Sequence, residues 1–180
     1  MPVQHRARTV VFLAVNASYA HTNLAEWFLR AGKVPYDWRW VSLESTGNDD
    51  QYDLLGRLVA TRPDVLAASV YLFNREFLAK VLRRFKKLQP DTVIIGGGPE
   101  FLGDNRELFD RGRWLDAVVR GEGERAFGAL LKAWDRPGKW RTIPGVCFAD
   151  ARGYHDGGMA EHVADLDAMP SPYANSLDGF

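Results

Sequence analysis

The chain of 180 residues contains one cysteine, Cys147, and its charges cancel. A single cysteine excludes an internal disulfide, a cysteine-rich zinc site and an iron–sulfur cluster held by this chain alone. The 23 basic and 23 acidic side chains give zero formal net charge, which argues against a protein that binds phosphate backbones. The first apolar run, residues 10–15, is too short for a signal peptide or a membrane span. These absences predict a cytoplasmic protein that binds neither nucleic acid nor membranes.

Sequence motifs of common enzymes are also missing. No G-x-x-x-x-G-K-[ST] occurs, and the glycine triplet at 96–98 does not match G-x-G-x-x-G. Neither a G-x-S-x-G elbow nor an H-E-x-x-H zinc motif is present, and the four histidines are scattered. The sequence therefore predicts no catalytic residue. It predicts a binding domain with no catalytic centre of its own.

What is present is an alternation of short apolar runs and longer amphipathic stretches, which is typical of repeated strand–helix units. We predict strands over 10–15, 38–43, 65–72, 92–95 and 117–119, and helices over 24–31, 52–61 and 74–88, with a last helix that follows residues 121–124 and runs through Trp134. In the first helix, Glu26 and Arg30 are expected on the side opposite the apolar residues. The fold class is thus α/β: a Rossmann-like (flavodoxin-like), doubly wound parallel sheet of five strands in the order 2-1-3-4-5.

The pattern changes after Pro137. Residues 146–149 are expected to form one arm of a hairpin, with the turn at 150–153 and Tyr154 beginning the return. The polar tail from Glu161 contains Pro170 and Pro172 and is expected to be a linker. We therefore divide the chain into a ligand-binding domain, 1–137, and a hairpin with linker, 138–180.

Candidate ligand-binding residues follow four of the predicted strands, because ligands of such sheets bind at the carboxyl ends of the strands. Each could instead have a structural role: Asn and Thr cap helices, and glycines form turns. Three consecutive glycines beside the small Ala67 and Ala68 nevertheless favour a bulky, polar ligand. The candidates are Asn16, Ser18, Tyr19, His21, Thr22, Asn23 and Leu24 after the first strand, Ser69, Tyr71 and Asn74 after the third, Gly96, Gly97, Gly98, Pro99 and Glu100 after the fourth, and Gly121, Glu122, Gly123 and Glu124 after the fifth.

The predicted helix over 74–88 has a strongly basic side. It consists of Lys80, Arg83, Arg84, Lys86 and Lys87. A run of charge on one side of an amphipathic helix usually faces solvent, and we interpret it so.

Six segments, in this order, resemble one known family: 16–25 (NASYAHTNLA), 69–74 (SVYLFN), 97–100 (GGPE), 121–124 (GEGE), 143–145 (IPG) and 166–173 (LDAMPSPY). Together they resemble the N-terminal cobalamin-binding domain of cobalamin-dependent radical SAM proteins. The resemblance covers residues 10–173.

The resemblance implies a domain that holds cobalamin base-off, with the nucleotide tail buried between the sheet and its loops. Residues 16–24 with Ser69, Tyr71 and Asn74 would flank the tail, and residues 96–100 and 121–124 would contact the tail and the corrin amides. A following radical SAM domain of the same polypeptide would carry S-adenosylmethionine and a [4Fe-4S] cluster, which Cys147 alone cannot supply. Methyl transfer, or radical rearrangement and cyclisation, would be the reaction of such an enzyme.

The first loop departs from a related pattern at two positions. Methionine-synthase-type domains ligate cobalt through the histidine of D-x-H-x-x-G, whereas this chain reads Tyr19-Ala-His-Thr-Asn-Leu and lacks both Asp and Gly. Without the Asp that would orient the imidazole, we favour His21 as a residue of the pocket wall over His21 as a cobalt ligand, and we predict no other metal ligand.

Two other interpretations remain open from the residues. One is a flavodoxin-like regulatory or interaction domain without a cofactor. The other is the nucleotide-sugar-binding half of a glycosyltransferase.

Overall fold

Strand β1 (Arg8–Asn16) lies inside a sheet of seven strands, with the order β2-β1-β3-β4-β5-β6-β7. The computed structural model describes residues 7–19, 21–23, 25–26, 29, 38–110, 113–162 and 165. The predicted order 2-1-3-4-5 and the parallel pairing of these five strands are confirmed. The other four parallel strands are β2 (Trp38–Thr46), β3 (Val65–Ser69), β4 (Val93–Gly97) and β5 (Ala117–Val119).

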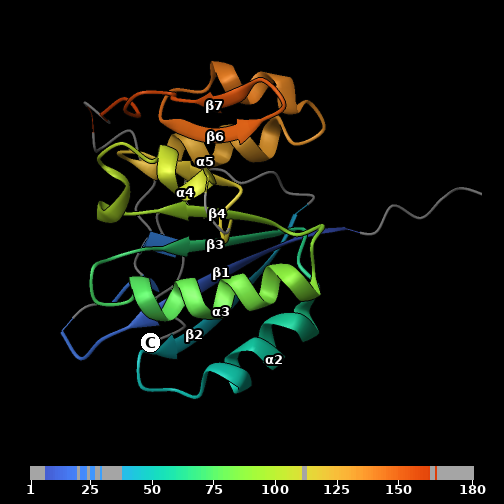
Figure 1. Ribbon diagram of the computed structural model, residues 1–180, viewed down its shortest axis with the longest axis vertical. Helices are drawn as coiled ribbons and strands as arrows, with labels where there is room; N and C mark the ends of the chain where they lie inside the picture. The colour runs from blue at the N-terminus through green and yellow to red at the C-terminus, as the bar shows by residue number, and fades with distance from the viewer. Residues whose placement is uncertain are drawn as a thin grey trace, which may run out of the picture.

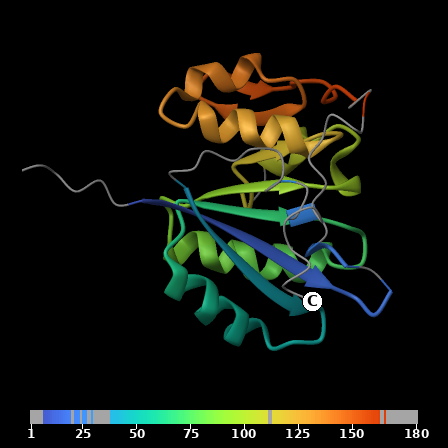
Figure 2. The same cartoon turned by 180° about the vertical axis from the view of Figure 1, so that it is seen from behind.

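Helices cover both faces of the sheet because the central strands are apolar on both sides. On β1, Val11 and Leu13 face a core shared with α2 (Gln51–Thr61) and α3 (Arg75–Leu88), while Val10 and Phe12 face the core under α5 (Gly123–Lys132). Figure 1 shows α2 and α3 in front of the sheet, and Figure 2 shows the opposite face. The shorter elements are α4 (Arg106–Asp110) and the 3-10 helices η1 (Pro99–Phe101) and η2 (Pro137–Thr142).

The predicted hairpin is present as β6 (Val146–Asp150) and β7 (Gly153–His155). It extends the same sheet, because β6 pairs antiparallel with β5. Trp140 and Ile143, between α5 and β6, are buried in the core under α5. Residues 138–155 therefore share a core with the strands that precede them.

The first helix differs from the sequence expectation at Glu26. Asn23, Ala25, Glu26 and Leu29 are helical, and the other residues of 24–31 lie outside the described residues. Glu26 is only 2% exposed instead of facing solvent. Its carboxylate accepts hydrogen bonds from Trp40 Nε1 at 2.7 Å and from the Ser42 hydroxyl. These donors on edge strand β2 allow the carboxylate to be buried.

Candidate functional site

A cavity of about 290 Å³ lies at the carboxyl ends of β3, β4 and β5, on the side of the sheet covered by α5. Its apolar wall comes from the strands, from α5, and from Ala25 and Leu29 between β1 and β2. The backbone and polar groups come from the loops that follow β3, β4 and β5. The apolar lining consists of Phe12, Ala25, Leu29, Ala67, Ala68, Ile95, Val119 and Phe127.

The three glycines at the end of β4, Gly96, Gly97 and Gly98, have three different structural roles. A Cβ atom on Gly96 would lie 2.7 Å from the Phe101 ring, so this glycine is required by core packing. Gly98 has φ +109°, and its Cβ would lie 2.6 Å from the carbonyl oxygen of Val70, so only glycine is tolerated. A Cβ on Gly97 would meet no atom within 4 Å. Of the three, Gly97 alone leaves open space at the cavity.

The N-cap residue and the first turn of α5 contribute one carboxylate each to the lining, from Glu122 and Glu124. Glu124 Oε2 is buried without a hydrogen-bond partner. Glu122 Oε1 lies 2.9 Å from Nδ1 of the exposed His162. A buried carboxylate oxygen without a hydrogen-bond donor costs free energy. A ligand in the cavity that donates a hydrogen bond to Glu124 Oε2 would remove this cost.

The structure brings about half of the predicted site residues to this cavity: Ser69, Tyr71, Gly96, Gly97, Gly98, Gly121, Glu122, Gly123 and Glu124. It does not place in the lining Asn16, Ser18, Tyr19, His21, Thr22, Asn23, Asn74, Pro99 and Glu100. Leu24 lies outside the described residues. The apolar lining residues Phe12, Ile95, Val119 and Phe127 were not predicted; three lie on strands and Phe127 lies on α5, all in the core under that helix.

Two asparagines at strand ends bond to the protein itself. Asn74 is fully buried; its Nδ2 donates to the carbonyls of Val15 and Ser69, each at 3.1 Å, and its Oδ1 accepts from Tyr71 N at 2.8 Å. It occupies the N-cap position of α3 without a side-chain cap hydrogen bond. Asn16 Oδ1 accepts from Thr22 N at 2.6 Å. Asn74 therefore joins the ends of β1 and β3, and Asn16 shapes the loop after β1.

Other residues of the predicted set are exposed at the same edge. His21 is exposed, and Tyr19 is 77% exposed, with its ring 5.8 Å from that of Phe73. Glu100 forms an ion pair with Arg75 at 3.1 Å. In the part of the chain that the structure describes, no three His, Cys, Asp or Glu side chains come together as a metal-binding group.

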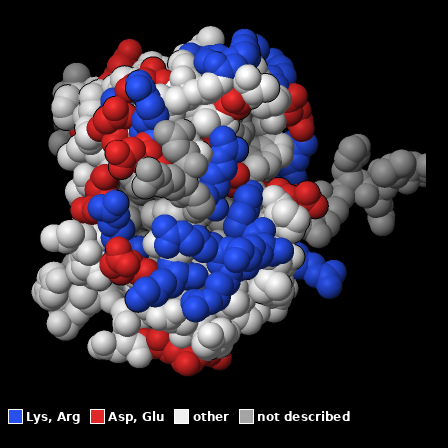
Figure 3. Space-filling view, viewed as in Figure 1, with Lys and Arg blue, Asp and Glu red and all other residues white. Residues whose placement is uncertain are grey.

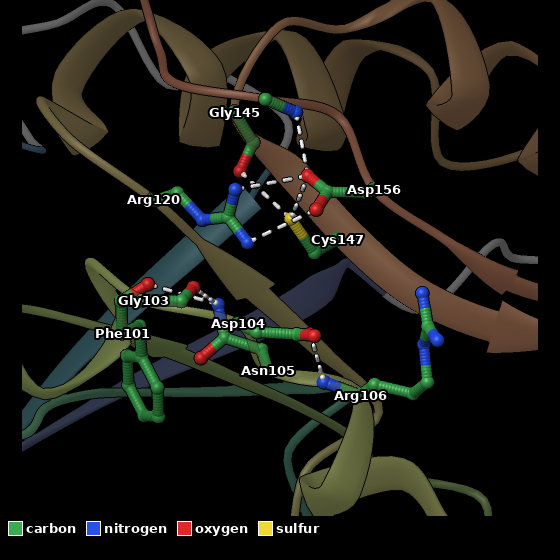
Figure 4. Close-up of polar contacts among 10 residues, drawn as sticks. Phe101, Gly103, Asp104, Asn105, Arg106, Arg120, Gly145, Cys147 and Asp156 are labelled. Carbon is green, nitrogen blue, oxygen red and sulfur yellow. Dashed lines mark hydrogen bonds and ion pairs between the residues drawn. The ribbon is translucent and has the colours of Figure 1, made fainter.

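An ion pair joins the segment after β7 to the end of β5 (Figure 4). Arg120 Nη1 and Nη2 donate to the two carboxylate oxygens of Asp156 at 3.0 and 3.2 Å, and Ala160 N donates to the carbonyl of Arg120 at 2.8 Å. The backbone N–H of Gly158 and the Arg120 guanidinium hold the pKa of Asp156 below its usual range. This pair positions the residue that directly precedes Gly121 and the cavity loop.

Cys147 lies beside this ion pair. Its Sγ is 3.6 Å from Asp156 Oδ1, and burial raises the pKa of the thiol. A buried thiol with a raised pKa is a poor nucleophile and a poor metal ligand.

The fold is a doubly wound α/β domain with a cavity at the carboxyl edge of its parallel strands. The family model described as "B12 binding domain" matches residues 12–131. Because this match spans two thirds of the chain, the protein belongs to the B12 binding domain family.

Curated relatives are enzymes that are longer than this chain. The chain is 36% identical over 115 residues to 2-(S-pantetheinyl)-carbapenam-3-carboxylate methyltransferase of Streptantibioticus cattleyicolor, covering 63% of this chain and 17% of the relative. It is 30% identical over 151 residues to hopanoid C-3 methylase of Methylococcus capsulatus, covering 81% of this chain and 28% of the relative. The chain thus spans less than a third of the length of either relative.

Solved structures share the fold. The cobalamin-dependent S-adenosylmethionine radical enzyme OxsB, with aqua-cobalamin and S-adenosylmethionine bound, aligns with a TM-score of 0.73 at 16% identity, over 93% of this chain and 24% of OxsB. The radical S-adenosylmethionine methyltransferase TsrM from Kitasatospora setae, with cobalamin and a [4Fe-4S] cluster bound, aligns with a TM-score of 0.67 at 21% identity, over 92% of this chain and 31% of TsrM. At these identities the likeness establishes the fold alone.

Proposed function

We propose that the chain is the cobalamin-binding domain of a cobalamin-dependent radical SAM enzyme, and that the cavity beside α5 holds the nucleotide tail of cobalamin. The observation that carries this proposal is the combination of open space at Gly97 with the unpartnered, buried oxygen of Glu124 on one cavity. Family membership favours this interpretation over a cofactor-free domain or a glycosyltransferase half.

The residues that line the cavity fit the nucleotide tail of cobalamin. A cavity of about 290 Å³ is at the lower end of the range of about 300–1,000 Å³ for ligand pockets, which suits a nucleotide tail better than a whole corrinoid. Apolar residues Phe12, Ile95 and Phe127 would pack against the flat base. Cobalamin is rich in hydroxyl and amide donors, which match an acceptor such as Glu124 Oε2.

Within the cavity, each polar residue has a separate task. The hydroxyl groups of Ser69 and Tyr71 would orient the tail from the β3 side, and Glu124 would accept a hydrogen bond from the β5 side. The two carboxylates at the start of α5 disfavour a phosphate at that wall, because like charges repel. We therefore place the ribose or a corrin amide beside Glu124. Bound cobalamin would supply a cobalt centre for one-carbon or radical chemistry.

The remaining site residues and the domain context belong to the same proposal. The loop after β1, including His21, would approach the corrin from outside the cavity, with His21 as a wall residue. Residues 138–180 would lead into a radical SAM domain that carries S-adenosylmethionine and a [4Fe-4S] cluster, and the full-length enzyme would transfer methyl groups or perform a radical rearrangement. The setting would be cytoplasmic. No helix among the described residues has the length and apolarity needed to span a bilayer.

The test is co-elution of corrin absorbance with the 180-residue chain after mixing with hydroxocobalamin and gel filtration. The wild-type chain should carry cobalamin, and Gly97→Val should lower the affinity at least about tenfold, because the new side chain projects into the cavity. Gly47→Val is the matched control, since Gly47 also has open space around its Cβ position but lies outside the cavity lining.

Two results would contradict the proposal. One is a wild-type chain that elutes without corrin absorbance. The other is a Gly97→Val variant that folds and retains cobalamin as well as the Gly47→Val control does.

A further inference from the structure

Four cations form a stripe along the outward side of α3: Lys80, Arg83, Arg84 and Lys87. Their spacing of three, one and three residues places them on one side of a helix. At 1.5 Å per residue the stripe is about 10 Å long. Figure 3 shows the resulting basic patch on the face of the molecule that α3 covers. The only acidic residue of α3, Glu76, lies at its N-terminal end.

Most of these charges have no counter-charge among the residues that the structure describes. Lys80, Arg83 and Lys87 are exposed and form no hydrogen bond or ion pair with any residue that the structure describes. The two remaining basic side chains of α3 are paired: Arg75 with Glu100 at 3.1 Å and Lys86 with Asp116 at 2.7 Å. The stripe is therefore the unneutralised part of a helix whose other cations have partners.

The fourth cation lies beside exposed apolar surface. Arg84 donates to Gln51 Oε1 at 2.9 Å, and its guanidinium lies 5.2 Å from the centre of the Tyr52 ring. Tyr52 is 67% exposed, and Leu88, one turn after Arg84, is 60% exposed. Arginine and tyrosine are enriched at protein–protein interfaces, where they lie beside apolar residues.

The stripe is separate from the proposed cobalamin site. The helix α3 packs on the face of the sheet opposite the one that α5 covers, whereas the cavity lies under α5. A partner on α3 can therefore bind without covering the cavity.

We propose that the α3 stripe is the docking surface for an acidic protein. A chain with zero net charge lacks the long-range positive potential that nucleic-acid binding requires. Insertion into a lipid surface requires a free apolar helix face, and the apolar face of α3, with Phe77, Val81 and Phe85, is buried in the core. An acidic protein surface matches both the cations and the exposed apolar residues of this patch. Its carboxylates would pair with the four cations, and its apolar side chains would cover Tyr52 and Leu88.

The test uses a fluorescein-labelled oligoglutamate peptide as probe and measures its anisotropy with the 180-residue chain at low salt. The stripe variant K80Q/R83Q/R84Q/K87Q should bind the peptide at least about tenfold more weakly than wild type, since each surface charge pair contributes a fraction of a kcal/mol. The matched control is R125Q/K132Q/R136Q/K139Q, which removes four exposed cations from α5 and the segment that follows it. It should bind within about twofold of wild type.

Circular dichroism and thermal melting check that both variants fold. The stripe variant and wild type should carry equal amounts of cobalamin after gel filtration with hydroxocobalamin, and this measurement separates the docking proposal from the cobalamin proposal. The docking proposal is overturned if wild type does not bind the peptide, or if the control variant loses as much binding as the stripe variant. It is also overturned if duplex DNA or phosphatidylserine vesicles bind more tightly than the peptide with the same dependence on the stripe.

Discussion

The carboxyl edge of the sheet has two halves that differ in how their polar groups are satisfied. At the ends of β1 and β3, the side chains of Asn16 and Asn74 bond to groups of the protein itself. At the ends of β4 and β5, Gly97 leaves open space and Glu124 Oε2 is buried without a partner. A polar side chain at a strand end thus indicates a ligand contact only when the protein leaves it unpaired. The asparagine half holds the edge together, and the glycine half is where we propose that the ligand binds.

The largest expected effect comes from breaking the asparagine half. Asn74→Ala removes the partners of the Val15 and Ser69 carbonyls and of the Tyr71 N–H. We expect a loss of about 2–4 kcal/mol in the free energy of unfolding, because each buried, unsatisfied backbone group is costly. Urea denaturation measures it, with the partly exposed Asn16→Ala as the milder comparison. A loss within experimental error would mean that Asn74 does not join β1 and β3.

Within the glycine half, an alanine substitution at Gly96 and one at Gly97 should have different effects. Gly96→Ala should destabilise the fold by about 1–3 kcal/mol, since the buried Phe101 ring stands 2.7 Å from the new Cβ. Asn105 donates to the Phe101 carbonyl at 2.8 Å and restrains this residue (Figure 4). Gly97→Ala should change stability by less than about 0.5 kcal/mol and should instead weaken cobalamin binding. Thermal melts and cobalamin titrations of both variants test this; equal destabilisation by the two would refute the assignment.

A smaller effect is expected at the free carboxylate. Glu124→Gln keeps the shape of the side chain and replaces the unpartnered oxygen or its neighbour with an amide group. If a ligand donates to Glu124, cobalamin affinity should fall by about threefold to tenfold, the value of one hydrogen bond. Glu161→Gln, on an exposed residue outside this cavity, is the control. Affinities that are equal for both variants would remove Glu124 from the site.

The sequence was sufficient to predict the strand order, because buried strands read as short apolar runs and right-handed crossovers leave few topologies. It was also sufficient to find the glycine and glutamate loop. It could not separate Asn74 from a ligand-binding residue, since the carbonyl of Val15 lies 59 residues away in the chain. Gly96 likewise gives no sign that Phe101 occupies its Cβ position. Phe12 and Ile95 look like ordinary core residues until the cavity shows which strand ends lack a covering side chain.

The smallest effect is expected where a buried group is unpartnered but far from the cavity lining. His155 Nε2 has no hydrogen-bond partner, and burial, with the nearby Arg141, lowers the pKa of this histidine. The unfolded chain therefore takes up a proton at higher pH than the folded chain, so stability falls as the pH drops through the ordinary histidine value near about 6.5. We expect the melting temperature to fall by about 1–2 °C between about pH 7.5 and pH 5.5 from this residue. Asp156, whose pKa is lowered, contributes a separate loss of stability below about pH 4.

His155→Gln should abolish the contribution of His155 to the pH dependence, whereas His21→Gln, which removes an exposed imidazole, should leave it. An unchanged pH dependence in His155→Gln would show that the imidazole finds a hydrogen-bond partner in solution.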